Sequence, residues 1–196
     1  MIGFDADQDC SGVAELAKSR GVAFICRYLK NLGTQEIQIL SAAGLQIVSI
    51  FESTAERAKE GAEAGAEDSA RALEQASALG QPQGSAIYAT ADFDCSEEEL
   101  EGVLRYFRAF KAGLGSEGKL GVYGCGRVCE ATAAAGVADF TWLAGGLGMN
   151  GSREFAKSGN ATIQQDVGDK RGLDLGISID SDLASTEDFG GWRLET

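Results

Sequence analysis

Two aspartates, Asp92 and Asp94, stand one residue apart at the end of the apolar segment GSAIYATADFD, residues 84–94. If this segment is a β-strand, its side chains alternate between two faces. One face is then apolar, with Ile87, Ala89, Ala91 and Phe93, and the other is polar, with Tyr88, Thr90, Asp92 and Asp94. A pair of carboxyl groups at the end of a buried strand can perform general acid–base chemistry.

Acidic residues end other strand-like segments as well: Asp5, Glu52, Asp166 and Asp180, with Asp182 two residues further on. Carboxyl groups that converge repel one another, which raises the pKa of at least one and lets it hold a proton as a general acid. Taken singly, each acid is explained as a turn former or a helix N-cap, and Asp94 could cap the helix that follows it. Acids at five strand ends favour a functional cluster.

The elements that must position these acids alternate along the chain. Strands are predicted over 1–5, 22–29, 45–52, 84–94, 119–124, 140–145, 161–166 and 175–180. Helices are predicted over 11–21, 34–44, 63–80, 97–115 and 127–136, with Thr34 and Ser96 as N-caps and loops between the last strands.

Alternating strands and helices indicate parallel β/α units. Eight strands favour one compact α/β domain over 1–196, a (β/α)8 TIM-like barrel with reduced C-terminal helices. In such a barrel the polar face of 84–94 points to the axis, and the acids gather at the carboxyl rim. A doubly wound open sheet is the structural alternative.

The composition excludes several classes of binding partner and of catalytic mechanism. The 196 residues carry a formal net charge of −13 and include no histidine. Phosphate binding needs basic clusters, so we expect no nucleic-acid partner, and no apolar run approaches the roughly 18–20 residues that cross a bilayer. Without histidine, Ser-His-Asp and Cys-His catalysis are excluded, which leaves carboxylates, tyrosine, lysine and cysteine for acid–base work.

Cysteine usage predicts reduced thiols and no disulfide framework. The count is odd, and no signal-peptide pattern precedes it: Cys10, Cys26, Cys95, Cys125 and Cys129. We therefore expect the chain to be cytoplasmic as synthesised. Cys125 and Cys129 do not predict a zinc site when histidine is absent, and we expect no metal and no cofactor.

Nearly the whole chain resembles a known family, the glycoside-hydrolase-like TIM-barrel family catalogued as domain of unknown function 1906. It is also similar, more distantly, to the lysozymes of glycoside hydrolase family 25. The matching stretches are GFD at 3–5, FICRYL at 24–29, SAAGLQIVSIFE at 41–52, residues 65–94, GVYG at 121–124, TWLAGG at 141–146, IQQD at 163–166 and ISIDSDL at 177–183.

The resemblance implies a sugar-polymer substrate, with the glycan strand of bacterial peptidoglycan as the expected partner. The aspartate, Asp-x-Glu and final acid of the family-25 lysozymes map onto Asp5, Asp92-x-Asp94, and Asp180 or Asp182. Asp94 departs from the pattern, because the lysozymes have there the glutamate that acts as general acid. Either the cleft is remodelled, or the substrate differs, or lysozyme activity is absent.

The catalytic set predicted on this basis is Asp94 as the acid, Asp92 as the group that orients water or an acetamido group, and Asp5 and Asp182 as groups that hold sugar hydroxyls. The predicted substrate-binding set is Arg27, Tyr28, Glu52, Tyr123, Trp142, Gln164, Asp166 and Asp180. Tyr123 and Trp142 stack on sugars or pack the barrel top. Arg27 neutralises part of the acid ring or forms a structural ion pair.

Strand geometry bears on the mechanism. Residues i and i+2 are roughly 6.6 Å apart along a strand, closer to the separation of inverting enzymes than to that of retaining ones. The Asp92–Asp94 pair therefore favours inversion, or assistance from an N-acetyl group of the substrate, over double displacement.

Three other functions stay open. The first is a carbohydrate-binding barrel without catalysis, which the aspartate at 94 favours. The second is a nucleotide-binding protein, because Gly124-x-Gly126 follows a strand, although Cys129 replaces the third glycine of that fingerprint. The third is a nucleophilic Cys95 or Cys125, which no histidine activates. A monomeric, phage-type endolysin that reaches the wall after lysis or delivery is the expected setting.

Overall fold

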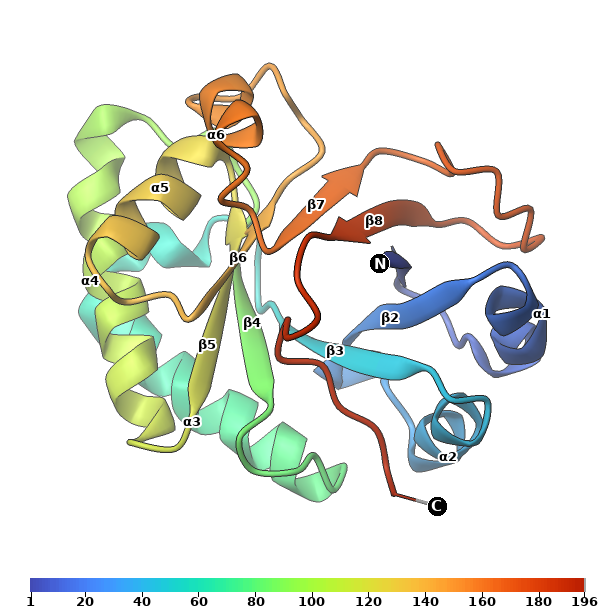
Figure 1. The fold of residues 1–196 in the computed structure, drawn as a ribbon. Helices are drawn as coiled ribbons and strands as arrows, with labels where there is room; N and C mark the ends of the chain where they lie inside the picture. The colour runs from blue at the N-terminus through green and yellow to red at the C-terminus, as the bar shows by residue number, and fades with distance from the viewer. Residues whose placement is uncertain (196) are drawn as a thin grey trace.

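The alternation of apolar and helix-forming segments closes into a barrel. The computed structural model describes residues 1–195, and in it eight strands pair in sequence order around a closed ring (Figure 1). The strands are β1 (Ile2–Ala6), β2 (Val22–Tyr28), β3 (Gln46–Phe51), β4 (Ala86–Ala91), β5 (Lys119–Gly124), β6 (Phe140–Leu143), β7 (Ile163–Asp166) and β8 (Asp180–Ala184). The predicted TIM-like barrel is confirmed, and the open-sheet alternative is wrong.

The last strand runs in the opposite direction to the rest. The ladders from β1 to β7 are parallel, whereas β8 is antiparallel to both β7 and β1. The predicted eighth strand over 175–180 is therefore wrong: Asp180 begins β8 instead of ending it. No helix stands between β7 and β8 in the described chain, so the connection never returns to the amino rim. The reversal places Asp180 at the carboxyl rim, where the prediction also put it.

Six α-helices cover part of the barrel in residues 1–195, and none lies outside β7 and β8 (Figure 1). They are α1 (Ala14–Ser19), α2 (Thr34–Ala42), α3 (Ala62–Ala78), α4 (Glu97–Leu114), α5 (Gly126–Ala134) and α6 (Ser152–Ser158), with short 3-10 turns η1 (Ser11–Val13), η2 (Leu29–Asn31) and η3 (Arg57–Glu60). The reduced C-terminal helices are as predicted, although α6 occupies a segment predicted to be loop. None of the helices in this range is long and apolar enough to span a bilayer.

A side-chain cap marks the start of α4 but not that of α2. Ser96 and Glu99 form the predicted capping box of α4, in which each side chain accepts a hydrogen bond from the other residue's backbone N–H. The N-cap of α2 is Gly33, and Thr34 is already the first helical residue, so the predicted Thr34 cap is wrong. Each helix start lies at the carboxyl rim, because it follows a strand that ends there.

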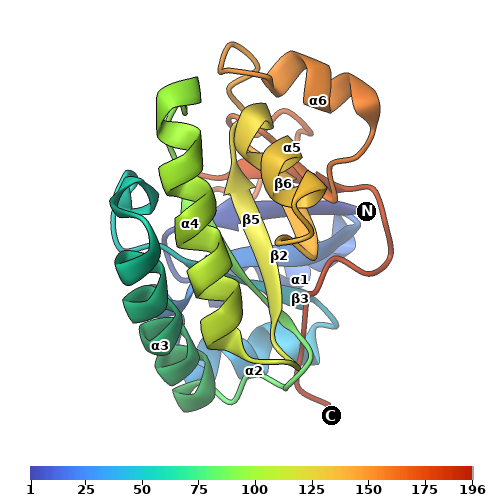
Figure 2. The same cartoon turned by 90° about the vertical axis from the view of Figure 1, so that its left-hand side faces the viewer.

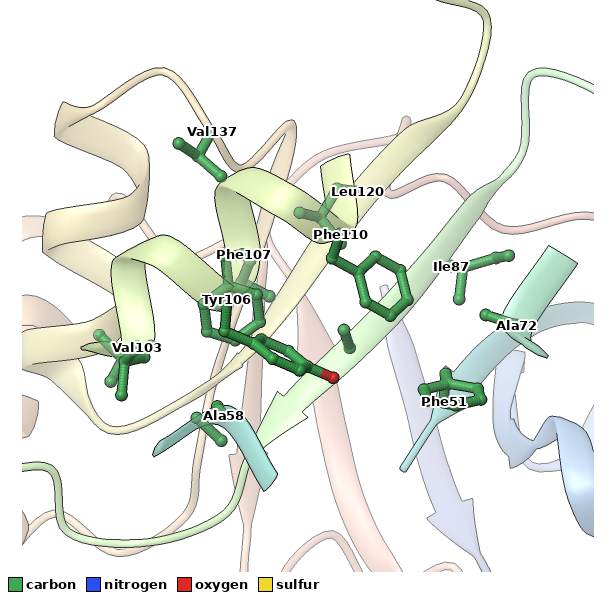
Figure 3. Close-up of a cluster of buried hydrophobic side chains, with 14 of the residues drawn as sticks. Phe51, Ala58, Ala72, Ile87, Val103, Tyr106, Phe107, Phe110, Leu120 and Val137 are labelled. Atoms are coloured by element: carbon green, nitrogen blue, oxygen red, sulfur yellow. The ribbon is translucent and has the colours of Figure 1, made fainter. Parts of the chain in front are cut away.

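A hydrophobic core between α3, α4 and the sheet fixes this side of the barrel. Tyr106, Phe107 and Phe110 of α4 pack over Phe51 of β3 and Ile87 of β4 (Figure 3). The two helices lie side by side (Figure 2). Their close approach needs a glycine in each helix: a Cβ at Gly65 would stand 2.2 Å from a backbone oxygen of α4, and one at Gly113 would overlap the Ser69 side chain.

The barrel interior is filled by aromatic side chains below the rim. Phe24, Tyr88 and Trp142 are fully or almost fully buried there, and Phe189 enters from the segment after β8. The phenol of Tyr88 donates to the backbone oxygen of Phe189 over 2.8 Å, and the Phe24 and Phe189 rings lie 4.6 Å apart. These aromatic side chains close the lower half of the barrel interior.

Candidate functional site

A hollow at the carboxyl rim collects most of the predicted residues. Its deep part, about 30 Å3, and its outer part, about 300 Å3, share Asp5, Tyr28, Asp92, Tyr123 and Gln165 as lining residues. The deep part is completed by Ile50, Glu52, Thr90 and Trp142, and the residues that complete the outer part include Asp180, Gly145, Gly146, Met149 and Val167. We call this hollow the rim pocket. Seven predicted site residues meet in it: Asp5, Tyr28, Glu52, Asp92, Tyr123, Trp142 and Asp180.

Strand alternation accounts for this convergence. On β4, Ile87, Ala89 and Ala91 lie in the core beneath the helices, while Tyr88 faces the interior and Thr90 faces the rim pocket. Asp92 follows the last residue of β4 and keeps the inward phase. The predicted assignment of the two faces of this strand is therefore confirmed as far as Asp92.

A chain of hydrogen bonds connects two of the acids through Gln165. The amide nitrogen of Gln165 donates to Asp5 Oδ2 over 2.8 Å. The amide oxygen of Gln165 accepts from the Tyr123 hydroxyl over 3.0 Å and from the backbone N–H of Gly145 over 3.1 Å. Tyr123 also lies 3.5 Å from Asp92 Oδ1. Asp5 and Asp92 are thus held on either side of one amide–phenol relay.

Asp182 lies below the rim pocket, out of contact with solvent. It is 0% exposed, and its carboxyl accepts from Trp142 Nε1 over 2.9 Å and from the Cys26 thiol over 3.7 Å. Both donors are neutral, so burial raises its pKa well above the ordinary value, and repulsion from Asp5 adds to the rise. Asp182 is therefore a carboxyl beneath Asp5 whose ionisation is disfavoured by burial.

Asp5 lines the rim pocket and has a raised pKa. Burial raises the pKa of its carboxyl from 3.8 to about 7, and the negative charges of Asp180 and Asp92 add to this rise. Hydrogen bonds with Gln165 and Asp182 oppose it. Near neutral pH both protonation states of Asp5 are populated, which is the condition for efficient proton transfer.

The aromatic residues divide between the floor and the wall of the rim pocket. Trp142 is 1% exposed and donates its indole N–H to Asp182, so it packs the floor and presents little surface for stacking. Tyr123 packs edge-on to Trp142 at 5.0 Å and keeps part of its ring exposed. Burial raises the pKa of Tyr28 and Tyr123, so both phenols stay protonated. The Tyr28 hydroxyl can donate to a ligand, whereas the Tyr123 hydroxyl already donates to Gln165.

Asp94 does not share the rim pocket with Asp92. β4 has ended at Ala91, the chain has turned toward α4, and the exposed Asp94 carboxylate accepts from the backbone N–H of Asn150 over 2.6 Å. The same loop is held by Asn150 Nδ2, which donates to the backbone oxygen of Cys95 over 3.2 Å. Asp94 therefore connects the segment after β4 to the segment before α6. The expected pairing of Asp92 and Asp94 over the barrel axis is wrong.

Three other predicted residues lie outside the rim pocket. Arg27 is 0% exposed on the outer face of β2, where its Nε is 2.7 Å from Glu36 of α2, so it forms the structural ion pair and does not neutralise the acid ring. Asp166 pairs with Arg171 over 2.8 Å. Gln164 lies opposite Leu183, on the face of β7 that points away from the axis.

Gln165 is the site residue that the sequence analysis missed. It lies opposite Asp182 in the β7–β8 ladder and is 8% exposed. The signal was present in the alternation of strand residues: Ile163 and Gln165 share one face, so a buried Ile163 in the interior places Gln165, and not Gln164, toward the axis.

The described residues offer no metal site and no reactive thiol. No group of three or more histidine, cysteine or acidic side chains within 1–195 is arranged to hold a metal ion. All five cysteines are buried and free. Burial raises the pKa of the Cys95 thiol to about 11, which disfavours the thiolate that a nucleophile needs.

Comparison with known proteins finds one matching family model and several solved structures of similar fold. The model of the family described as "Rv2525c-like, glycoside hydrolase-like domain" matches residues 16–184. The uncharacterized protein YbfG of Bacillus subtilis is 27% identical over 167 residues, which is 79% of this chain but only 23% of YbfG.

Among solved structures, the Tat-secreted protein Rv2525c of Mycobacterium tuberculosis, in complex with L-tartrate, is similar with a TM-score of 0.81 at 23% identity, covering 98% of both chains. The catalytic domain of endolysin ply40, from bacteriophage P40 of Listeria monocytogenes, has a TM-score of 0.59 at 13% identity over 95% of this chain and 93% of that one. The autolysin LytC of Streptococcus pneumoniae, with a synthetic peptidoglycan ligand, has 0.57 at 9% identity over 92% of this chain and 46% of its own. At these identities the likeness shows the fold alone.

Proposed function

The chain belongs to the Rv2525c-like family of glycoside hydrolase-like domains, and from that premise we propose that its rim pocket hydrolyses glycosidic bonds of bacterial peptidoglycan. The observation that carries this proposal is the Asp5 carboxyl, with a pKa of about 7, in the same pocket as the exposed carboxylate of Asp92. A carboxyl that can hold a proton, beside a second and exposed carboxyl, is the pairing that glycoside hydrolysis uses.

The roles follow from burial and hydrogen bonding. Asp5 donates its proton to the glycosidic oxygen as the bond to the anomeric carbon breaks. Asp92 orients the attacking water and accepts its proton, and its negative charge stabilises the oxocarbenium-like transition state. Gln165 holds Asp5 in place, and the Tyr123 phenol connects the two sides of the pocket. Asp5 therefore takes the role that Asp94 was expected to play.

A shared fold and the lining of the pocket support a peptidoglycan substrate. The chain shares its fold with the catalytic domain of a phage endolysin and with an autolysin crystallised with a peptidoglycan ligand. The outer part of the rim pocket, about 300 Å3, is open to solvent and lined by carboxylates, phenols and glycines, which suits sugar hydroxyls. We take the active form to be a monomer. It acts on the wall after lysis or delivery.

The test is digestion of purified peptidoglycan with the wild-type protein and with Asp5→Asn. We expect soluble muropeptides with new reducing ends from the wild type, and mass spectrometry of these products identifies the bond cut. Asp5→Asn should release none while remaining folded. The kcat/KM of the wild type should fall above pH 7, because the acid is then ionised. Full activity of Asp5→Asn contradicts the assignment of the acid.

A second candidate function is a carbohydrate-binding barrel without catalysis. The observation that favours it is Asp94, which stands where the family-25 lysozymes have their acid and is held by the backbone of Asn150 outside the rim pocket. Such a barrel would sediment with insoluble peptidoglycan and yield no soluble product at any pH between 4 and 8. Binding and product release, measured in one digestion, separate the two functions.

A further inference from the structure

The rim pocket has a neighbouring hollow at the end of β3. Glu52 and Ile50 line both the rim pocket and a neighbouring hollow of about 220 Å3. The other lining residues of this hollow, which we call the β3 groove, are Lys30, Phe51, Ser53, Arg71 and Gln75. Ser53 and Arg71 in turn line a wider, open hollow between η3 and α3. The three hollows therefore follow one another along this side of the barrel, with Glu52 between the first two and Ser53 and Arg71 between the last two.

The charge of the lining changes along this path. Among the described residues, the rim pocket is lined by four acids, Asp5, Glu52, Asp92 and Asp180, and by no basic side chain. The β3 groove adds two cations, Lys30 and Arg71. In a chain with a formal net charge of −13, these two cations line the hollow next to the rim pocket.

The ammonium of Lys30 is held at the junction by residues of the rim pocket. It donates to the backbone oxygen of Glu52 over 3.2 Å and lies 5.2 Å from the centre of the Tyr28 ring. Within residues 1–195 no carboxylate oxygen comes within 4.0 Å of it. Its remaining N–H donors are therefore free for a ligand, because an ammonium carries three donors and one is used.

Arg71 supplies a second, more constrained cation. One arm of its guanidinium pairs with the buried Asp68, and the group lies 5.9 Å from the centre of the Phe51 ring. Its side chain is 50% exposed, so part of the guanidinium faces the groove. Asp68 already compensates its charge, which makes Lys30 the stronger attraction for an anion.

On the premise of the proposed function, we propose that the β3 groove is a subsite for a carboxylate carried by the glycan substrate, with Lys30 as the principal contact and Arg71 as the second. A neutral glycan needs no cation at this position. An anionic glycan is repelled by the acids of the rim pocket and needs a compensating charge close to them. A singly charged carboxylate matches one free ammonium beside Glu52.

The opposite side of the rim pocket gives the bound polymer an orientation. Gly145, Gly146, Met149 and Val167 line that side, and Val167 is 59% exposed. These residues bring no charge and present an apolar surface, which suits a methyl group of the substrate. A carboxylate-bearing unit therefore occupies the β3 side, and an uncharged unit lies against Met149 and Val167.

The test compares binding by three proteins: wild type, Lys30→Gln, and Lys157→Gln, whose exposed lysine on α6 is a matched control far from the groove. The probes are purified peptidoglycan, peptidoglycan whose carboxyl groups are amidated, polygalacturonate, and a neutral chitin oligosaccharide. We expect Lys30→Gln to weaken binding to native peptidoglycan about five-fold, the size of one exposed ion pair, and Lys157→Gln to leave it unchanged. Binding to the amidated and neutral probes should be equal in all three proteins.

The probes also distinguish the source of the carboxylate. A loss on native peptidoglycan alone assigns it to the muramyl and peptide groups, and a loss on polygalacturonate as well assigns it to any sugar acid. An equal loss on the neutral probe, no loss on any probe, or no wild-type binding to either carboxylate polymer overturns the subsite. Hydrolysis is scored separately with Asp5→Asn, so a protein that binds through Lys30 but releases no product keeps the subsite and disproves the proposed function.

Discussion

Replacing Asp5 with asparagine should stabilise the fold at alkaline pH, and the gain should vanish in acid. Asparagine has the shape of a protonated aspartate and can accept the same hydrogen bond from Gln165. The wild-type carboxyl has a folded pKa of about 7, raised from 3.8 mainly by burial. Between these values the folded state binds more protons than the unfolded state, so wild-type stability falls as pH rises from about 4 to about 7 and then levels off.

The size of this effect follows from the same pKa. A rise from 3.8 to about 7 corresponds to an upper limit of about 4 kcal/mol at 1.36 kcal/mol per pKa unit. Asp5 is partly exposed, so solvent screening reduces this value, and about half of it, ~2 kcal/mol, is the expected gain of Asp5→Asn above pH 7. For a domain of this size that is a rise of about 4–8 °C in Tm.

The assay is thermal unfolding of wild type and Asp5→Asn in matched buffers from pH 4 to pH 8.5. Asp7→Asn, an exposed aspartate two residues away, is the control and should shift Tm by no more than about 1 °C at any pH. The reasoning is refuted if the Asp5→Asn difference is the same at pH 4 and pH 8, or if the variant is less stable than wild type at pH 8. Either result would mean that the Asp5 carboxyl is not held against its own ionisation.

Three further substitutions test other parts of the site. Asp94→Asn should keep at least about a third of wild-type kcat in reducing-end release, because Asp94 accepts a hydrogen bond from the backbone of Asn150 outside the rim pocket. If this variant loses activity as completely as Asp5→Asn, Asp94 is the general acid. Gln165→Leu removes a hydrogen-bond donor that lowers the Asp5 pKa, so the alkaline limb of the kcat/KM profile should move to higher pH while kcat falls. An unmoved limb would mean that the Gln165 hydrogen bond does not influence the Asp5 pKa. Arg27→Met leaves Glu36 buried without its partner and should lower the free energy of unfolding in urea by about 3–5 kcal/mol, with KM unchanged. A raised KM would show that Arg27 contributes to substrate binding.

The sequence predicted the barrel and most of the acid cluster because both depend on local patterns. Alternation along residues 84–94 placed Asp92 toward the axis without knowledge of any other strand. The same rule, applied strictly, separates Arg27 from Tyr28 and Gln164 from Gln165, since adjacent strand residues face opposite sides. Arg27 and Gln164 enter the predicted set only as parts of the motifs that contain them, and the structure turns both away from the pocket.

Other features of the site depend on contacts between distant segments and were beyond reach of the sequence. The direction of β8 is set by a connection without a helix after Asp166, and nothing in ISIDSDL distinguishes a parallel strand from an antiparallel one. Asp94 leaves the axis because a backbone N–H 56 residues later meets its carboxylate. The pKa of Asp5 comes mainly from burial, which exists only once the strands have closed around it.

The energetic cost of the acid cluster itself argues for catalysis over passive binding. Sugar hydroxyls can be bound by amides as well as by carboxylates, and an asparagine in place of Asp5 would hold the Gln165 hydrogen bond without the burial penalty. A carboxyl placed over a second, fully buried carboxyl, Asp182, gains nothing for binding that an amide lacks. What it gains is a proton that leaves near pH 7. A barrel that only bound glycan would be more stable with an amide at position 5 and would bind with the same affinity. If Asp5→Asn stabilises the protein and leaves glycan affinity unchanged, proton transfer is the property that the aspartate provides.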